Sequence, residues 1–205
     1  MNQKKQHFYL KTPKILLCPY LKQFIPLYHQ FMQDEEILYL TGSEPLTIDE
    51  ELQNQESWLK DESKYTFIIF QKDENIKLHY DDFPEETYNY RMVGDINLFF
   101  HSYIEENEAE IDVMIADKQA RRQGLAQQAV EIMMDFGMAY YKKNRFIAKI
   151  KNDNQKSIKL FEKIGFLKFE EVQKFNEVHY QMIFSDIMTM DQFYQKYQHI
   201  SNVQI

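Results

Sequence analysis

The stretch from Ala109 to Tyr140 most strongly limits how this chain of 205 residues can fold. Residues 109–116 mix β-branched and acidic residues over a length that is typical of a strand. A short basic turn follows, and apolar residues then recur at helical spacing. The apolar face consists of Leu125, Ala129, Ile132, Met133, Phe136 and Tyr140. The pattern predicts a strand, a turn and a long amphipathic helix, in that order.

The turn between this strand and this helix, Arg121-Arg122-Gln123-Gly124-Leu125-Ala126, has the features of an anion-binding loop. The first N–H groups of a helix have no partners within the helix, and the helix dipole favours negative charge there. Gly124 and Ala126 are small enough for a phosphate to approach the backbone, and Arg121 and Arg122 add positive charge. The turn has neither the Gly-Lys-Ser/Thr of a P-loop nor the three glycines of a dinucleotide fingerprint. A phosphate-binding loop and an ordinary surface turn are both compatible with these six residues.

Composition and charge exclude several classes of function. The net charge of −8 disfavours a nucleic-acid partner, whose phosphates would be repelled. The single cysteine, Cys18, excludes an internal disulfide and fits a reducing compartment. No apolar run approaches the ~20 residues of a membrane span, and residues 1–6 are polar without a signal-peptide core behind them. The six histidines show no metal-ligand spacing. We therefore expect a soluble cytoplasmic protein that needs no metal and binds neither nucleic acid nor membrane.

The rest of the chain alternates between strand-like and helix-like stretches. Strands are expected at residues 14–20, 65–70, 91–100, 145–151, 166–173 and 177–184. Helices are expected at about 24–31, 47–60 and 152–166, the second of them opened by a capping box of Thr47 and Glu50. Residues 72–90 form a long acidic and aromatic stretch without helical or strand periodicity. We interpret this stretch as a surface insertion, or as a loop that shapes an acceptor site.

A second motif, Asn154-x-x-Ser157-x-x-Leu160-Phe161-x-Lys163-x-Gly165-Phe166, lies one strand beyond the first. Asn154 can cap a helix and Gly165 is placed to end it, which by itself indicates an ordinary capped helix. In order and spacing, however, the two motifs together resemble the cofactor motifs of the GNAT family of N-acetyltransferases. Five further stretches, and with them residues 8–184 as a whole, are similar to the N-acetyltransferase 9-like branch of that family. These stretches are Ser43–Thr47, Ser57–Trp58, Lys64–Ile68, Met92–Phe99 and Glu110–Ala116.

The resemblance implies an α/β fold with a mixed, mostly antiparallel central sheet that is splayed at the cofactor site and flanked by helices. Residues 1–184 would form the acetyltransferase domain, and residues 185–205 a C-terminal extension with helical character. The cosubstrate would be acetyl-CoA, and an N–H group of Met114 or Ile115 would polarise its thioester carbonyl. The residues that the resemblance assigns to cosubstrate binding are Met114, Ile115, Ala116, Arg121, Arg122, Gln123, Gly124, Leu125, Ala126, Asn154, Ser157 and Phe161.

Catalysis of acetyl transfer requires a base, because the acceptor amine must lose a proton. Glu110 is the first candidate and Asp112 the second, since both point to the same face of the strand near the expected thioester; the loop residue His101 is a third. Both carboxylates could instead be solvent-facing positions on a half-buried strand. The GNAT family often has a tyrosine as general acid where this chain has Phe161, which cannot donate a proton. Tyr180 is a candidate substitute, and a thiol with a pKa of roughly 8.5 can also leave without an acid.

Two hypotheses of function follow from the resemblance. The first is an acetyl-CoA-dependent protein N-acetyltransferase that acts on a lysine side chain or an N-terminus. Tubulin or microtubules would be its partners, with a cytoskeletal or ciliary location. The alternative is a catalytically weak or inactive GNAT-fold interaction protein that is bound to microtubules or to a ciliary assembly.

The C-terminal stretch, residues 185–205, lies beyond the resemblance. Thr189 or Asp191 could cap a short helix with apolar residues gathered on one side. These residues are Met190, Phe193, Tyr194 and Tyr197. So short a helix is not stable alone in water and needs a surface to pack on. We expect it to fold back on its own domain; docking on a partner is the alternative.

Overall fold

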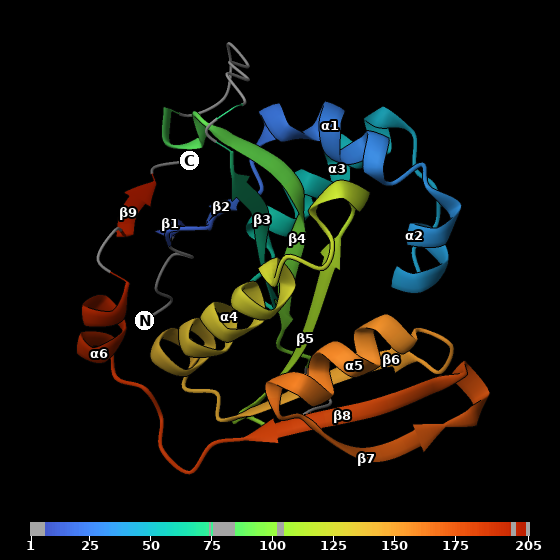
Figure 1. The fold of residues 1–205 in the computed structure, drawn as a ribbon, viewed down its shortest axis with the longest axis vertical. Helices are drawn as coiled ribbons and strands as arrows, with labels where there is room; N and C mark the ends of the chain where they lie inside the picture. The colour runs from blue at the N-terminus through green and yellow to red at the C-terminus, as the bar shows by residue number, and fades with distance from the viewer. Residues whose placement is uncertain (1–6, 74, 76–84, 102–104, 198–199, 204–205) are drawn as a thin grey trace.

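A computed structural model describes residues 7–73, 75, 85–101, 105–197 and 200–203 (Figure 1). In this part of the chain a nine-stranded sheet has the order β7-β8-β6-β5-β4-β3-β2-β1-β9. All neighbouring strands are antiparallel except β5 and β6. The strands are β1 (His7–Lys11), β2 (Ile15–Pro19), β3 (Lys64–Lys72), β4 (Tyr90–Phe99), β5 (Glu108–Ile115), β6 (Arg145–Lys151), β7 (Leu167–Val172), β8 (Glu177–Ile183) and β9 (Ile200–Val203). The predicted mixed, mostly antiparallel sheet is confirmed.

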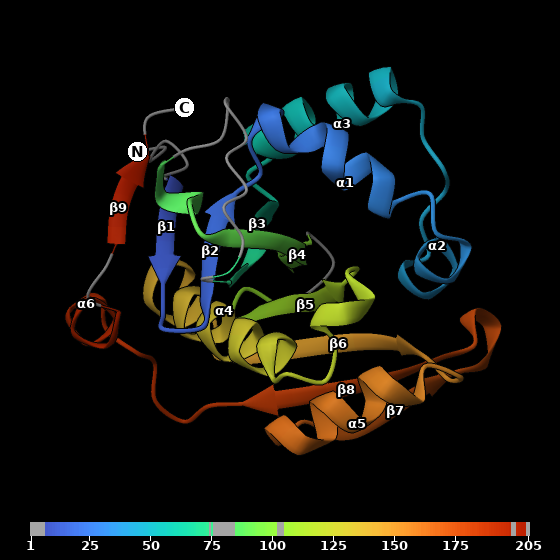
Figure 2. The same ribbon diagram turned by 45° about the horizontal axis from the view of Figure 1, so that its top comes forward.

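Helices cover both faces of the sheet. They are α1 (Ile25–Phe31), α2 (Glu35–Thr41), α3 (Ile48–Lys60), α4 (Leu125–Tyr141), α5 (Gln155–Ile164) and α6 (Met190–Lys196). Figure 2 shows α1, α2 and α3 on one side of the sheet and α4 and α5 on the other. We call these sides the α1–α3 face and the α4–α5 face.

Local sequence signals explain where the longer helices begin and end. The capping box of Thr47 and Glu50 opens α3, as predicted. Asn154 caps α5 by accepting from the Ser157 N–H at 3.1 Å, and Gly165 ends that helix in a left-handed conformation (φ 113°). The helix expected after the basic turn is α4. These signals succeed because each is local: one side chain or one glycine satisfies the free backbone groups of a helix end.

Each face of the sheet has its own apolar cluster. On the α4–α5 face, Phe136 of α4 is fully buried and meets Phe8 of β1 and Tyr65 and Phe67 of β3. On the α1–α3 face, buried side chains of β2 and β3 pack with Phe24, Ile25 and Tyr28. The sheet is thus covered on both sides, and its central strands are held in place from both.

Strands β5 and β6 diverge, and this divergence sets up the site. They pair in parallel only from Glu108 to Glu110 on β5, against Arg145 to Ile147 on β6. Beyond that point β5 continues to pair with β4 as far as Ile115, whereas β6 continues to pair with β8 as far as Lys151. Figure 1 shows the two strands separating, with α4 and α5 on either side of the gap in the ribbon. This is the splayed sheet that the resemblance implied.

The C-terminal stretch folds back on the domain. Thr189 caps α6 with a capping box, and the fully buried Phe193 packs on Phe136 and Tyr140 of α4. Asp135 of α4 accepts hydrogen bonds from Lys196 at 2.6 Å and Tyr197 at 2.5 Å. Strand β9 then adds to the outer edge of β1.

Three features lay outside the sequence-based predictions: strand β1, helix α2 and strand β9. Of the long stretch 72–90, residues 74 and 76–84 lie outside the described residues, so neither interpretation of that stretch is tested. None of the helices in the described part is both long and apolar enough to cross a membrane.

Candidate functional site

The basic turn at residues 121–126 places an open helix N-terminus beside the gap between β5 and β6. Arg122 and Gly124 both have positive φ, at 64° and 80°. A Cβ added at Gly124 would meet no other atom within 4 Å, so the space in front of this residue is open. Gly124 is the N-cap of α4, and its first turn contains neither a side-chain cap nor an acidic residue. The leading N–H groups of α4 therefore lack a side-chain cap and can bind an anion.

The side chains of the turn are held by the surrounding structure. Arg121 donates from Nε to the carbonyl of Ile115 at 2.9 Å, which ties the turn to the end of β5. Gln123 donates to the carbonyl of Gln119 at 2.8 Å. Leu125 is buried in the cluster of the α4–α5 face and anchors the helix start. The turn is therefore preorganised, with Arg122 exposed at its surface.

Helix α2 connects the two sequence motifs. Its Glu36 contacts Arg121 of the first motif at 3.5 Å and Lys156 of α5 at 3.3 Å. Its Tyr39 donates to Asp153, which precedes α5, at 2.7 Å. The two motifs, more than thirty positions apart in the chain, are thus brought to the same side of the molecule.

The backbone groups of Met114 and Ile115 face opposite edges of β5. A Cβ added at Gly94 would collide with the carbonyl of Met114, so the Met114 backbone faces β4. The backbone of Ile115 faces the other way, toward the open edge, because neighbouring residues of a strand alternate and its carbonyl accepts from Arg121. The Ile115 N–H, and not that of Met114, is therefore the donor on the open edge.

Phe161 and Tyr180 both belong to the α4–α5 face. Phe161 is 2% exposed and packs edge-on against Phe166. The Tyr180 hydroxyl donates to Glu162 at 2.9 Å. Burial, and then the neighbouring Glu162, raise the pKa of Tyr180. Tyr180 and the strand carboxylates Glu110 and Asp112 thus lie on opposite sides of the sheet.

Glu110 is engaged by two basic groups. Its carboxylate lies 2.6 Å from Lys149 Nζ of β6 and 3.4 Å from His101 Nε2. Glu110 also ends the pairing of β5 with β6, opposite Ile147. His101, the third candidate base, is therefore a partner of the first candidate.

Asp112 is the first residue on this face of β5 beyond the β5–β6 pairing, and it is open to solvent. Its Oδ1 accepts a hydrogen bond from Asn97 Nδ2 at 2.8 Å. The same nitrogen donates to Oδ2 of Asp95 at 2.8 Å. Asp95 and Asn97 are each 4% exposed and lie on β4, two positions apart. Partial desolvation by the surrounding protein raises the pKa of Asp112, although one side of its carboxylate reaches solvent. Burial together with the nearby Asp112 raises the pKa of Asp95 to about 7.

Further polar groups surround these carboxylates on the α1–α3 face. The Tyr28 hydroxyl lies 3.5 Å from Asp95, and Tyr20 donates to Glu51 at 3.1 Å. Lys64 lies with its ammonium 3.0 Å from the centre of the Trp58 ring. Burial lowers the pKa of Lys64 to about 8. We call the set Tyr20, Tyr28, Glu51, Lys64, Thr66, Asp95, Asn97 and Asp112 the polar cluster.

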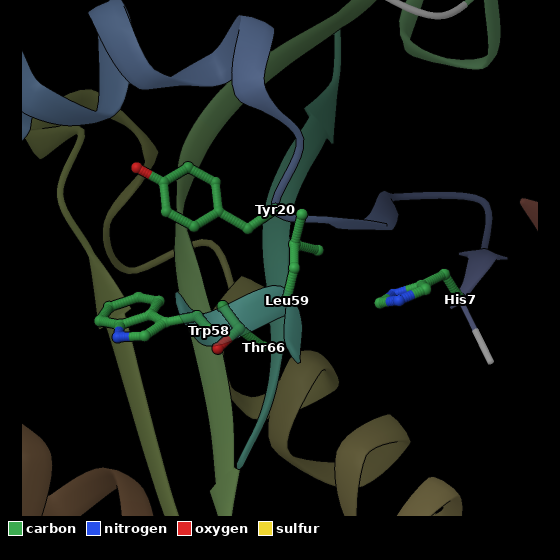
Figure 3. Close-up of a pocket in the computed structure, with 5 residues that line it drawn as sticks. All are labelled: His7, Tyr20, Trp58, Leu59 and Thr66. Atoms are coloured by element: carbon green, nitrogen blue, oxygen red, sulfur yellow. The ribbon is translucent and has the colours of Figure 1, made fainter. Parts of the chain in front are cut away.

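A small cavity lies beside the polar cluster. His7, Tyr20, Trp58, Leu59 and Thr66 line it (Figure 3), and its volume is about 10 Å³. This is room for about one water molecule. The cavity is too small for a substrate.

The sequence identified Asp112 but not its partners. Asp95 and Asn97 interrupt an otherwise apolar strand at alternate positions, which is the one signal that could have revealed them. The sequence around Lys64 and Glu36 does not distinguish them from ordinary surface residues, because an isolated charged residue is usually exposed to solvent. Within the described residues, no group of three or more His, Cys, Asp and Glu side chains is arranged to hold a metal ion.

Comparison with known proteins places this geometry among acetyltransferases. The family model of an acetyltransferase (GNAT) domain matches residues 14–167. The chain is 41% identical over 169 residues to an N-acetyltransferase 9-like protein of Dictyostelium discoideum, with 80% of each chain covered. It is 35% identical over 181 residues to the alpha/beta-tubulin-N-acetyltransferase 9 of Mus musculus, with 88% of this chain and 73% of the relative covered.

Solved structures have the same fold. A spermidine N-acetyltransferase from Vibrio cholerae, in complex with CoA and spermine, matches with a TM-score of 0.69 at 15% identity. That match covers 84% of this chain and 96% of the other. A ribosomal L7/L12 alpha-N-protein acetyltransferase in complex with coenzyme A matches with a TM-score of 0.65 at 15% identity, covering 85% and 97%.

Proposed function

Because the chain belongs to the GNAT family of acetyltransferases, we propose that it transfers an acetyl group from acetyl-CoA to an amine of a protein acceptor. The observation that carries this proposal is a juxtaposition at the end of β5. An open helix N-terminus, a free strand edge and a solvent-facing carboxylate follow one another within the residues from Asp112 to Leu125.

The turn fits the pyrophosphate of acetyl-CoA. The space in front of Gly124 is open, the first N–H groups of α4 are available, and Arg121 and Arg122 supply positive charge. Gln123, Leu125 and Ala126 complete the turn. Asn154, Ser157 and Phe161 of the second motif would border the cosubstrate from α5. The two CoA complexes among the structural neighbours support this assignment.

The free edge of β5 fits the pantetheine arm. Ile115 and Ala116 follow the stretch where β5 has parted from β6, so an extended chain can align beside the strand as an added strand would. The Ile115 N–H would then donate to the thioester oxygen as negative charge develops there. Met114, whose backbone faces β4, would contribute its side chain and not its N–H.

The reaction needs one base and one oxyanion donor. An acceptor ammonium gives a proton to the base and becomes a neutral amine, whose lone pair attacks the acetyl carbonyl. A C–N bond forms, the C–S bond breaks, and the sulfur leaves with the electron pair. The second proton of the nitrogen passes to the thiolate or to solvent, so the products are the amide, CoA and one released proton.

Asp112 is better placed than Glu110 to be this base. Asp112 faces solvent beyond the β5–β6 pairing, and its raised pKa increases its affinity for a proton. Glu110 has the Lys149 ammonium 2.6 Å away, so an ion pair already occupies that carboxylate. We therefore propose Asp112 as the base and Glu110 as the second candidate.

Departure of the thiolate needs no dedicated acid in this arrangement. Phe161 has no proton to give, and the Tyr180 hydroxyl is committed to Glu162 on the opposite face of the sheet. A thiol with a pKa of roughly 8.5 is a good leaving group without protonation.

The names of the relatives suggest the acceptor. Mouse and human relatives are named alpha/beta-tubulin-N-acetyltransferase 9. We propose that the acceptor is the N-terminal amine or a lysine of tubulin, which would give the protein a cytoplasmic, cytoskeletal place of action.

Transfer of isotope-labelled acetyl from acetyl-CoA to purified tubulin tests the proposal. Mass spectrometry would locate the label on the N-terminal amine or on a lysine. Tubulin whose N-terminus is already blocked serves as the matched control and separates the two positions. Microtubule binding without any label transfer would favour the non-catalytic alternative and overturn the proposal.

A further inference from the structure

We propose that Asn97, oriented by Thr66 and backed by Asp95, is a positioning residue that fixes the Asp112 carboxylate for proton transfer from the acceptor amine. This inference rests on the proposed function and extends it to three residues that never meet the acceptor. It starts from the hydrogen bonds within the polar cluster.

Thr66 determines which way the Asn97 amide points. The Thr66 hydroxyl donates to Oδ1 of Asn97 at 2.6 Å. The amide nitrogen must therefore face the other way, where it donates to Asp95 and to Asp112 at 2.8 Å each. An amide nitrogen has two hydrogens, and both are used here. Asn97 is thus locked from both ends.

Burial separates the supporting residues from the reactive one. Thr66 of β3 and Asp95 and Asn97 of β4 are buried, whereas Asp112 of β5 is open to solvent. The three strands are in register, since Thr66 pairs with Asn97 and Asn97 pairs with Asp112. The row runs across the sheet and ends at the one member that an acceptor can reach.

Folding stability alone does not explain why Asp95, Asn97 and Asp112 occupy these strand positions. A buried carboxylate costs folding free energy unless its charge is compensated, and two carboxylates that share one donor also repel each other. An apolar pair at these strand positions would stabilise the sheet at least as well. Stability alone does not account for Asp95, whereas an action of its charge on Asp112 does.

The charge of Asp95 acts on Asp112 by coupling the pKa values of the two carboxyl groups. Two carboxylates bridged by one amide titrate as a pair, and the second proton leaves at a higher pH than it would from a single carboxylate. The upper titration of the pair is expected at about pH 7, the value to which burial and Asp112 raise the pKa of Asp95. The charged or titratable groups that face the pair are Lys64 from β3, Tyr28 from α1, Tyr20 beyond β2, Glu51 from α3 and Glu110 from β5.

Thr66→Val tests the orientation of the amide. The variant keeps the shape of residue 66 but removes its hydroxyl, so Asn97 loses the group that fixes its orientation. We expect a fall of up to about 10²-fold in kcat, with unchanged affinity for acetyl-CoA. Thr66→Ser retains the hydroxyl and should restore most of the rate. Equal rates for Thr66→Val and the wild type would overturn the role of Thr66 and Asn97.

Asp95→Asn tests the coupling without relying on activity. The Asp112 carboxyl signal in ¹³C NMR, assigned with Asp112→Asn, should report the titration of its partner Asp95 as an inflection near pH 7 in the wild type. In Asp95→Asn that inflection should be lost and one at lower pH should remain. The matched control is Asp135→Asn, which removes a buried carboxylate from α4 and should leave the Asp112 signal unchanged.

The outcomes separate this inference from the proposed function. An Asp112 titration that is identical in the wild type and in Asp95→Asn overturns the coupling, whether or not the protein transfers acetyl groups. A loss of the inflection in a protein without transfer activity would support the coupling and count against the proposed function only. In an active enzyme, the rise of kcat/KM near pH 7 should also be missing from Asp95→Asn.

Discussion

The two faces of the sheet are built on different principles. On the α4–α5 face, buried strand positions are filled by apolar and aromatic side chains around Phe136. On the α1–α3 face, the central strands β3 and β4 place Lys64, Asp95 and Asn97 among buried residues. Burying these polar groups reduces the stability that the same positions could give if apolar. Both faces have an apolar cluster, but only the α1–α3 face also buries a set of polar groups beneath its central strands. Under the proposed function, this loss of stability is the cost of positioning the base.

The largest effect on folding is expected at Phe136. Phe136→Ala would remove a fully buried ring and leave a cavity where strands β1 and β3 and helix α6 pack on α4. A loss of about 3–5 kcal/mol in the free energy of unfolding is expected. Urea denaturation measures it. A loss below about 1 kcal/mol would mean that the α4–α5 face is not the main source of stability.

The C-terminal extension should contribute to the same face. Phe193→Ala removes the ring that fastens α6 to α4, and a loss of about 3 kcal/mol is expected. Tyr194→Phe is the matched control, because it removes only the hydroxyl that meets Tyr140 at 2.8 Å. If Phe193→Ala left the isolated protein as stable as the wild type but weakened microtubule binding, the extension would serve a partner and not the domain.

The free energy of unfolding should depend on pH through the polar cluster of the α1–α3 face. The pKa of Asp95 is raised by burial from its unfolded value of about 3.9 to about 7 in the folded protein. A raised carboxyl pKa favours the folded state at low pH, and that advantage is lost as the pH rises from about 4 to about 7. Asp95→Asn should reduce this fall in the free energy of unfolding, with Asp112 contributing the part that remains, whereas Asp135→Asn should retain it in full. An unchanged pH profile in Asp95→Asn would contradict the assignment.

The smallest effect on folding is expected at Gly124, which belongs to neither face. Gly124→Val forces a branched residue into a positive φ and costs about 1–2 kcal/mol. The variant should also lose the rise in melting temperature that acetyl-CoA gives the wild type, because its side chain occupies the open space before α4. Gly42→Val is a matched control, since Gly42 has a φ of 65° and open surroundings but lies at the end of α2. An acetyl-CoA shift that survives in folded Gly124→Val would remove the turn from the site.

The sequence predicted the helices and strands well and the contacts of the polar cluster poorly. The start of α3, the stop of α5 and the order of the strands from β2 to β8 follow from caps, glycines and alternation, all of which act locally. The GNAT family was identified from two motifs, and the matches over most of the chain confirm it. Strand β9 was missed because its pairing with β1 joins the two ends of the chain. A contact at such a distance leaves no local pattern.

The candidate site shows the same division. The sequence located the turn at residues 121–126 and the carboxylates of β5. It could not show that Lys149 pairs with Glu110, or that Asn97 bridges Asp95 and Asp112, because these contacts depend on strand register. The contacts of Glu36 of α2 with Arg121 and Lys156 were not predicted either, because they depend on how α2 packs in the folded domain.

Acetyl transfer by Asp112→Asn, compared with Glu110→Gln, tests the central claim most directly. Each substitution keeps the shape of the side chain and removes its capacity to accept a proton. Asp112→Asn should lower kcat by about 10²–10⁴-fold at neutral pH while the affinity for acetyl-CoA stays the same. Glu110→Gln should have the smaller effect, because Lys149 already engages that carboxylate. Full activity in folded Asp112→Asn, with acetyl-CoA binding intact, would contradict the claim that Asp112 of the polar cluster takes the proton from the acceptor amine.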